Sequence, residues 1–513
     1  MDPMTDLKTT AGKIEDLGNR LSEARTPMGA DIVEALHAAG HLSARERVEK
    51  LVDEGTFVEM DALARHRSTA FGREHDRPYT DGIVTGYGVV DKRKVCVFSQ
   101  DATVFGGTQG EVYAEKLTKL YDLALKTGVP IIGLYDSTGP RVQEGIATLA
   151  GYARIMARVT AASGLIPQIG VVLGDTAGIA AFAPTLSDVL IFTEGATLHQ
   201  AAGHVADADV ESFGGAAVHA AAGTAQLVAT DEEEALSLAR DVLSFLPANN
   251  RAEAPRSAAE VAAGAIADNI TERDRALDVI IPDGAAEAYD MRDVIATVVD
   301  EGSFFELSAS TAENILTGFA HIEGRAVGIV ANQPLALAGA LDAAAAEKAA
   351  RFIRTCDAFN TPVIEFVDSP GFVPTSEEEK AGLVRRASKL AFAFAETTVG
   401  TLTVITRKAI GPAYVFMGSK DLGADLVYAW PTAEIAVTQA SQAALAIYGE
   451  GANPDNEAEL AAQFLHPYAA AENGLVDNVI EPSATRGYLI EGLRLLERKV
   501  VAQLPKKHGN ITL

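Results

Sequence analysis

The segment RKAIGPAYVFMGSKDLGADLVYAWPTAEIAV, residues 407–437, follows a short apolar run, Leu402–Ile405, that is typical of a buried strand. Its Gly-Pro-Ala turn at 411–413 and Gly418 are small enough to let the backbone approach a ligand closely. The first amide groups of a helix that begins there would point at that ligand. The arrangement is that of an oxyanion hole, where backbone N–H groups stabilise charge on a carbonyl oxygen. One such turn is more often an ordinary strand–turn–helix corner, so the rest of the chain must decide.

The first half of the chain repeats the plan of the second half. The octet VDEGTFVE at 52–59 returns as VDEGSFFE at 299–306, 247 residues later. At spacings of 232 and 233 the matches are Thr85-Gly86 with Thr317-Gly318, Pro130 with Pro362, Asp136-Ser137 with Asp368-Ser369, Gly139 with Gly371, Val171 with Val404, and Gly178 with Gly411. Such an ordered series indicates internal duplication.

Each half is expected to alternate strands and helices, which predicts an α/β fold. The expected strands are 94–99, 130–135 and 168–173 in the first half and 326–331, 362–367 and 401–406 in the second. The expected long helices are 110–127 and 341–359. We expect an N-terminal domain over 1–250, a linker over 251–284 with a short helix within 258–267, and a C-terminal domain over 285–513.

Composition narrows the class of function. A chain of 513 residues exceeds the size at which a single core stops growing. The net charge of −27 argues against nucleic acid as a partner. No long apolar run predicts a membrane span, and the N-terminal residues do not resemble a signal peptide. Two distant cysteines fit a cytoplasmic protein without disulfides, and no cluster of residues predicts a metal site.

Longer motifs carry a resemblance to a known family. They are AGHLSARERVEKLVDEGTF at 39–57, the run YTDGIVTGYGVV to YAEK at 79–116, VDSPGFVP at 367–374, MGSKDLGAD at 417–425 and AWPTAEIAV at 429–437. Over nearly its whole length the chain resembles the carboxyltransferase (β) subunits of biotin-dependent acyl-CoA carboxylases, such as propionyl-CoA carboxylase. The resemblance implies two tandem crotonase-like domains, each a spiral of ββα units.

The resemblance also implies an activity and partners. The family moves CO2 from carboxybiotin, carried by a biotin carboxylase or biotin carboxyl carrier subunit, to the α-carbon of an acyl-CoA. It implies a hexamer, either of one chain or mixed with carboxyltransferase paralogues. The site would lie between the N-domain of one subunit, which holds acyl-CoA, and the C-domain of another, which holds biotin.

Two oxyanions arise in this chemistry, so two holes are expected. The first would combine Gly178 and Ile179 with the turn Gly139, Pro140 and Arg141. The second would combine Gly411, Pro412 and Ala413 with Gly371 and Phe372, beside Tyr414. His199, His204 and His219 are interpreted as loop or surface residues, because the chemistry needs no Ser-His-Asp triad.

The chain departs from the family pattern at these turns. The usual Asp-Ser-Gly-Gly-Ala-Arg has Pro140 at its alanine, the usual Ala-Gly-Gly has Ile179, and the usual Gly-Gly-Ala-Tyr has Pro412. Proline has no backbone N–H, and one lost oxyanion donor costs about 10²–10³ in rate. The stretch 193–219 also looks shortened. Three hypotheses stay open: an active carboxyltransferase, a catalytically impaired structural or regulatory paralogue in a mixed complex, and a subunit of a biotin-dependent acyl-CoA decarboxylase.

Overall fold

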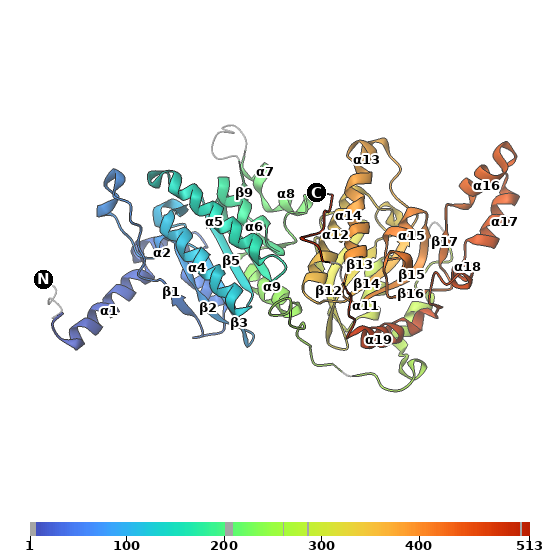
Figure 1. The fold of residues 1–513 in the computed structure, drawn as a ribbon, viewed down its shortest axis with the longest axis horizontal. Coiled ribbons are helices and arrows are strands. Elements are labelled where there is room, and N and C mark those ends of the chain that lie inside the picture. The colour runs from blue at the N-terminus through green and yellow to red at the C-terminus, as the bar shows by residue number, and fades with distance from the viewer. Residues whose placement is uncertain (1–6, 201–208, 260, 285–286, 503–504, 513) are drawn as a thin grey trace. The chain divides into compact units, whose positions relative to one another are not determined.

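The computed structural model describes residues 7–200, 209–259, 261–284, 287–502 and 505–512. The chain divides into two compact units, Met1–Asn250 and Arg251–Leu513 (Figure 1). Each unit is built around one mixed sheet and is described by itself below.

The sheet of the first unit has the strand order β1-β2-β3-β5-β7-β8-β10, and β9 pairs with β7 beyond it. The antiparallel pair β2 and β3 leads into the parallel strands β5, β7, β8 and β10. The bounds are β1 Val58–Met60, β2 Ile83–Val90, β3 Arg93–Gln100, β5 Ile131–Ser137, β7 Gln168–Ala177, β8 Val189–Thr193, β9 Thr197–His199 and β10 Leu227–Ala229. The central strands are almost wholly buried, which explains their continuous apolar runs.

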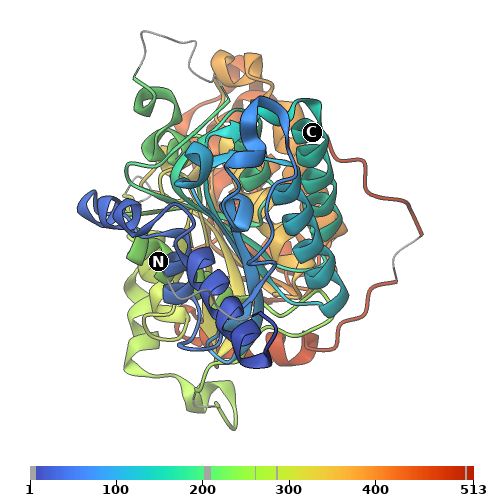
Figure 2. The same cartoon turned by 90° about the vertical axis from the view of Figure 1, so that its left-hand side faces the viewer.

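Helices cover both faces of this sheet. Helices α4 (Glu111–Thr127) and α5 (Ile146–Ala162) share one apolar core with β3 and β5, through Leu117, Leu120 and Ile155 among others. Helices α3 (Ala44–Leu51) and α9 (Glu232–Phe245) pack against each other and the sheet outside that core. In Figure 2, which turns this unit toward the reader, the teal helices line one side of the sheet. Two further helices, α1 (Thr10–Arg25) and α2 (Ala30–Ala38), precede them.

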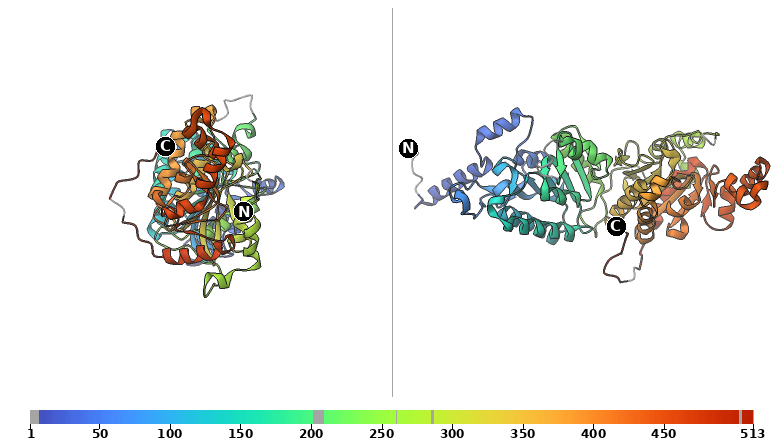
Figure 3. Two further views of the ribbon diagram at one scale, coloured as in Figure 1. Left: turned by 90° about the vertical axis from the view of Figure 1, so that its right-hand side faces the viewer. Right: turned by 90° about the horizontal axis from the view of Figure 1, so that it is seen from above.

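The second unit repeats this plan with the strand order β11-β12-β13-β14-β15-β16-β18, and β17 pairs with β15. The bounds are β11 Phe305–Leu307, β12 Ile315–Ile322, β13 Arg325–Asn332, β14 Val363–Ser369, β15 Thr401–Ile410, β16 Leu426–Ala429, β17 Glu434–Ala436 and β18 Asn478–Val479. One face carries α12 (Ala343–Ala358) and α14 (Leu383–Glu396), and the other packs on α11 (Met291–Val298) and α19 (Thr485–Leu496). Figure 3 shows the red helices α16 (Ala440–Tyr448), α17 (Pro454–Phe464) and α18 (Pro467–Glu472) at one end of this unit.

The strands and long helices expected from the sequence are confirmed within a few residues at each end. The short helix expected within 258–267 is wrong. Gly264 has φ +88° and Ala265 is extended, so only a 3₁₀ turn at Ile266–Asn269 follows. Among the described residues, no helix is long and apolar enough to span a bilayer.

Candidate functional site

In the first unit, the turn that follows β5 lies against the end of β7. Gly139 has φ +106°, a conformation that favours glycine, and a Cβ built on it would lie 3.3 Å from the carbonyl oxygen of Ala177. Gly178, the residue after Ala177, also has a positive φ of +60°. The structure therefore brings together the two turns that the sequence assigned to one hole.

The second unit has the same arrangement. Gly371, with φ +132°, follows β14, and a Cβ built on it would lie 3.8 Å from the carbonyl oxygen of Ile410. Gly411, the residue after Ile410, has φ +60°, the same value as Gly178. The four predicted turns thus form two equivalent pairs, one in each unit.

Hydrogen bonds fix which residues correspond. Pro140 pairs with Gln109 and Phe372 with Leu341, each in a parallel bridge. The next residue donates its N–H back across the bridge at 2.8 Å, from Arg141 to Gln109 in one unit and from Val373 to Leu341 in the other. Pro140 and Phe372 are therefore structural equivalents, and the residue at this position determines whether an amide N–H is present.

The two prolines lie in different units and at different turns. Pro140 removes an N–H from the turn after β5, whereas its equivalent Phe372 keeps one. Pro412 removes an N–H from the turn after β15, whereas Ile179 keeps one at the corresponding place after β7. Each unit therefore retains one of the two amide positions and has lost the other.

Pro412 is the first residue of the short helix α15 (Pro412–Phe416), a position that proline favours because a helix cannot pair that N–H. The buried Ala413 comes second, and the helix cannot pair its N–H either. Ala413 is thus the backbone donor that this turn offers.

Arg141 points into the protein, away from solvent. Its Nη1 donates to Asp81 Oδ1 at 2.5 Å and to Glu144 Oε1 at 2.8 Å, and its Nη2 donates to the carbonyl oxygen of Thr108 at 2.9 Å. The side chain is 1% exposed. These contacts hold the first turn in place and occupy both terminal nitrogens of the guanidinium.

The sequence did not predict two largely buried ion pairs at the ends of the strands. Asp136 accepts from Arg47 Nη1 at 2.9 Å in the first unit, and Asp368 accepts from Arg407 Nε at 2.9 Å in the second. The repeat of Asp136 as Asp368 was the available signal, but nothing in the sequence marked their arginine partners. Each pair anchors the strand that leads into one of the predicted hole turns.

An apolar cavity of about 730 Å³ opens beside the second turn. Residues from α15, β17, α16, α17 and α18 and the loops beside them line it: Gly411, Pro412, Tyr414, Val415, Ile435, Ala436, Val437, Thr438, Ala443, Leu460, Phe464, Leu465, Ala469, Ala470, Asn473 and Leu475. The Tyr414 hydroxyl is buried and has no hydrogen-bond partner among the described residues. Cavities that bind small molecules have this size and this mainly apolar lining with few polar groups.

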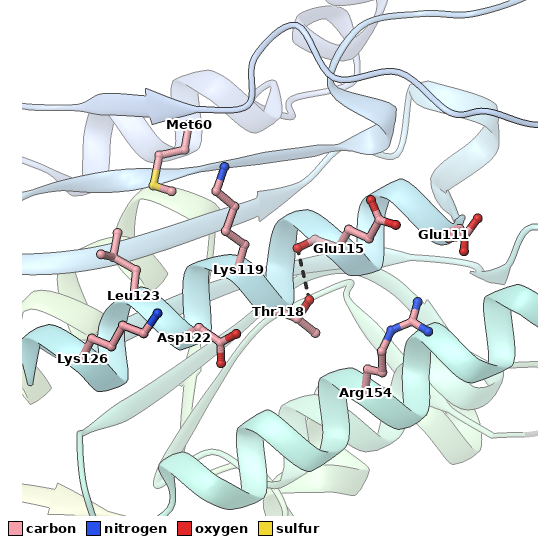
Figure 4. Close-up of a pocket in the computed structure, with 9 residues that line it drawn as sticks. All are labelled: Met60, Glu111, Glu115, Thr118, Lys119, Asp122, Leu123, Lys126 and Arg154. Carbon is pink, nitrogen blue, oxygen red and sulfur yellow. Dashed lines mark hydrogen bonds between the residues drawn. The ribbon is translucent and has the colours of Figure 1, made fainter.

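A second hollow, of about 620 Å³, follows helix α4 in the first unit (Figure 4). Its charges are of both signs, and several are paired, such as Lys119 with Asp61 and Arg67 with Glu115. Arg154 reaches toward it from α5. None of the predicted hole residues lines this hollow.

The interpretation of the histidines as loop or surface residues is wrong for two of them. His199 ends β9, is 8% exposed in its side chain and lies 3.0 Å through Nε2 from Asp175 Oδ1. His219 is half-buried in the helix α8 (Ala216–Ala221) and contacts the carbonyl oxygen of Leu198. His204 lies outside the described residues. The described residues contain no group of three His, Cys, Asp or Glu placed to hold a metal ion.

Comparisons with known proteins agree over nearly the whole chain. The carboxyl transferase domain family matches residues 35–511. The chain is 48% identical over 529 residues to the biotin-dependent acetyl-/propionyl-coenzyme A carboxylase beta5 subunit of Mycobacterium leprae, covering 99% of this chain and 96% of the relative. It is 49% identical over 532 residues to the propionyl-CoA carboxylase beta chain of Saccharopolyspora erythraea, covering 99% and 97%.

Two further similarities bear on the reaction. The chain is 44% identical over 518 residues to the methylmalonyl-CoA decarboxylase subunit alpha of Veillonella parvula, covering 99% of this chain and 100% of the relative. Its structure matches the transcarboxylase 12S hexamer crystallised with methylmalonyl-coenzyme A and methylmalonic acid. The TM-score is 0.94 at 39% identity, covering 98% of this chain and 99% of that one.

Proposed function

Because the chain belongs to the carboxyl transferase family, we propose that it is the carboxyltransferase subunit of a biotin-dependent acyl-CoA carboxylase. It would transfer CO2 from carboxybiotin to the α-carbon of an acyl-CoA. The predicted resemblance and the predicted fold of two tandem crotonase-like domains are confirmed. The single observation that carries the proposal is the equivalent pair of glycine turns in each unit, at Gly139 and Gly178 and at Gly371 and Gly411.

The backbone supplies the chemistry that this chain can offer. When bound through a partner subunit, carboxybiotin would supply the CO2 and a nitrogen base for the α-proton of the acyl thioester, while this chain's turns would hold the two oxygens. We assign the Ile179 N–H of the first unit to the thioester oxygen, since Pro140 beside it has no N–H. We assign Phe372 and Ala413 of the second unit to the biotin oxygen. The apolar cavity beside Gly411 has room for the rings of biotin, which supports placing biotin on this unit.

The remaining assignments concern assembly and location. A hexamer, of one chain or mixed with paralogues, is supported by the transcarboxylase 12S neighbour, which is itself a hexamer. A biotin carboxylase or biotin carboxyl carrier subunit would be the partner. Cys96 and Cys356 are free and buried, which is consistent with a cytoplasmic protein.

A second candidate function follows from one of the relatives. The 44% identity to a methylmalonyl-CoA decarboxylase subunit favours the reverse transfer, from a carboxylated acyl-CoA to biotin, at the same turns. Because of Pro140 and Pro412, the remaining hypothesis, a catalytically impaired structural or regulatory paralogue, stays an outcome of the test.

The experiment uses the purified full chain with a carrier protein whose biotin has been loaded beforehand with a labelled carboxyl group. Transfer of labelled carboxyl groups from the carrier to acetyl-CoA and propionyl-CoA is expected, together with a hexamer in light scattering. Ile179→Pro removes the remaining donor of the first unit and should reduce the rate by about 10²–10³.

The outcomes separate the hypotheses. Carboxyl transfer only from methylmalonyl-CoA to free biotin would favour the decarboxylase. No transfer in either direction would contradict both catalytic functions. A wild-type rate that Ile179→Pro leaves unchanged would show that this N–H does not serve the hole.

A further inference from the structure

Glu365 is a carboxyl group buried in the middle of β14 with no use in the proposed chemistry. The residue is 0% exposed. Neither Oε1 nor Oε2 has a hydrogen-bond partner among the described residues. A buried polar group without a partner costs free energy, and an ionised one costs far more, so such a group calls for an explanation.

The side chain points to the face of the sheet that α12 and α14 cover. Glu365 pairs in register with Val330 of the parallel strand β13, and two residues earlier Val363 pairs with Gly328. A Cβ on Gly328 would meet the sulfur of Cys356 on α12. Since residues two apart in a strand share a face, Glu365 lies under the same helices.

The carboxyl lies directly against Gly418. A Cβ built on Gly418 would lie 2.2 Å from Glu365 Oε2, so any side chain there would force the carboxyl or the peptide to shift. Gly418 also has φ +58°. Its carbonyl oxygen accepts from Thr403 Oγ1 at 2.7 Å, which holds the peptide in place over the carboxyl.

Gly418 is coupled to the second hole turn through two hydrogen bonds. Its neighbour Met417 donates its N–H to the carbonyl oxygen of Ala413 at 3.0 Å. On the other side, Ser419 Oγ donates to the carbonyl oxygen of Val415 at 3.2 Å. A shift of Gly418 would therefore disturb these hydrogen bonds to α15. The first turn of α15 contains Ala413, the proposed donor of the second hole.

The fold itself does not need a carboxyl at this position. The first unit has Gly133 at the equivalent place, 232 residues earlier, where β5 pairs with β7 in the same register. There the space is filled by the ring of Phe98. The acid is thus a feature of the second unit alone.

In the part of the chain that the structure describes, no charged group acts on Glu365, and burial alone shifts its pKa. The buried residues of α14 are apolar, and α12 contributes Cys356, whose pKa is itself raised by burial. Strands β13 and β15 contribute Val330 and Thr403. Burial alone raises the pKa of Glu365 well above its usual range.

We propose that Glu365 is a positioning residue of the second hole: its uncharged carboxyl supports Gly418 and the end of α15, and ionisation of that carboxyl displaces them. A carboxylate needs water or donors around it, and in this closed site water reaches it only if the Gly418 peptide moves away. Carboxyl transfer would therefore fall at alkaline pH. This effect on transfer rests on the proposed function, whereas the displacement does not.

The test compares Glu365→Gln, which keeps the shape without the ionisation, with wild type. The matched control is Glu491→Gln, an exposed glutamate of α19 that pairs with Arg494. Infrared difference spectra between wild type and Glu365→Gln at neutral pH should show the carbonyl band of a protonated acid. Amide exchange of residues 412–420 should rise more steeply with alkaline pH in wild type and Glu491→Gln than in Glu365→Gln.

Activity gives a separate reading. The rate of wild type and of Glu491→Gln should fall at alkaline pH, and Glu365→Gln should retain its rate there. Only carboxylate bands at neutral pH, or equal exchange profiles for 412–420 in all three proteins, would overturn the inference. If no protein transfers carboxyl groups, the proposed function fails, and the spectra and exchange still decide the inference. Should Glu365→Gln not fold, Glu365→Leu, uncharged at every pH, replaces it.

Discussion

Arg141 Nη1 donates to Asp81 Oδ1 at 2.5 Å, and both side chains are fully enclosed, at 1% and 0% exposed. The backbone N–H of Arg141 simultaneously closes the bridge to Gln109 at 2.8 Å. Side chain and backbone therefore fix the same turn from two directions. The sequence placed Arg141 in the turn of the first predicted hole, and the geometry favours a positioning role for its side chain.

Removing one partner of this pair should destabilise the protein. Arg141→Met leaves Asp81 and Glu144 buried without their cation, which typically costs about 3–5 kcal/mol. The free energy of unfolding in urea measures the loss. Arg154→Met on the exposed side of α5 is the control and should change stability by no more than about 0.5 kcal/mol. A stable Arg141→Met protein with weakened acyl-CoA binding would instead support a substrate-binding role.

Lys116 and Lys348 occupy equivalent positions in the two units, and both should contribute to the pH dependence of the free energy of unfolding. Each donates to backbone carbonyls, Lys116 to Thr80 and Ile83, and burial lowers each pKa to about 8. Between pH 8 and the unfolded value near 10.4, the unfolded chain binds more protons than the native one. Each lysine therefore increases the free energy of unfolding as pH rises through this window, by at most about 1.4 kcal/mol per pH unit. This contribution is lost as pH falls through 8.

The measurement is the difference between wild type and Lys116→Met in urea unfolding from pH 7 to pH 10. Lys116→Met also leaves two carbonyls without a donor, which adds an offset that does not depend on pH. Lys119→Met on the same helix, whose exposed ammonium pairs with Asp61, is the control and should follow wild type. Parallel curves for wild type and Lys116→Met would contradict the lowered pKa.

The fold was largely predictable because its signals are local and repeated. Buried strands such as 168–173 appear as continuous apolar runs, and the 232-residue spacing links the halves. The sequence could not indicate which residue forms an ion pair with a given buried charge. Arg47 and Asp136 lie 89 residues apart, and no periodicity links them. Nor could the sequence indicate that Glu365 has no partner, since a single glutamate in an apolar run carries no sign of its surroundings.

Gly418 and Glu365 should be energetically coupled. Gly418→Ala places a methyl group where the carboxyl lies, in addition to the strain at φ +58°. The double variant with Glu365→Ala removes the clash and keeps only the strain, so the two changes should be non-additive by about 0.5–3 kcal/mol. A double-mutant cycle in urea measures this. Gly382→Ala, at φ +85° with open space around it, reports strain without a clash. Additive effects would show that the contact is relieved by movement of the loop.

The two prolines provide the sharpest test of the hole assignment, because each has an equivalent residue that keeps its N–H. Pro140→Ala should raise the rate of carboxyl transfer, by up to about 10²–10³, since one donor is restored. Phe372→Pro should lower it by a similar factor, and Phe372→Ala, which keeps the N–H, separates the donor from the ring. The bridge bonds at both positions come from the following residue, Arg141 or Val373, so the exchange leaves them intact. Unfolding in urea checks that each variant is folded. If Phe372→Pro and Phe372→Ala transfer carboxyl groups at the same rate, this N–H faces no oxyanion, and Pro140 is then a neutral substitution in an active enzyme.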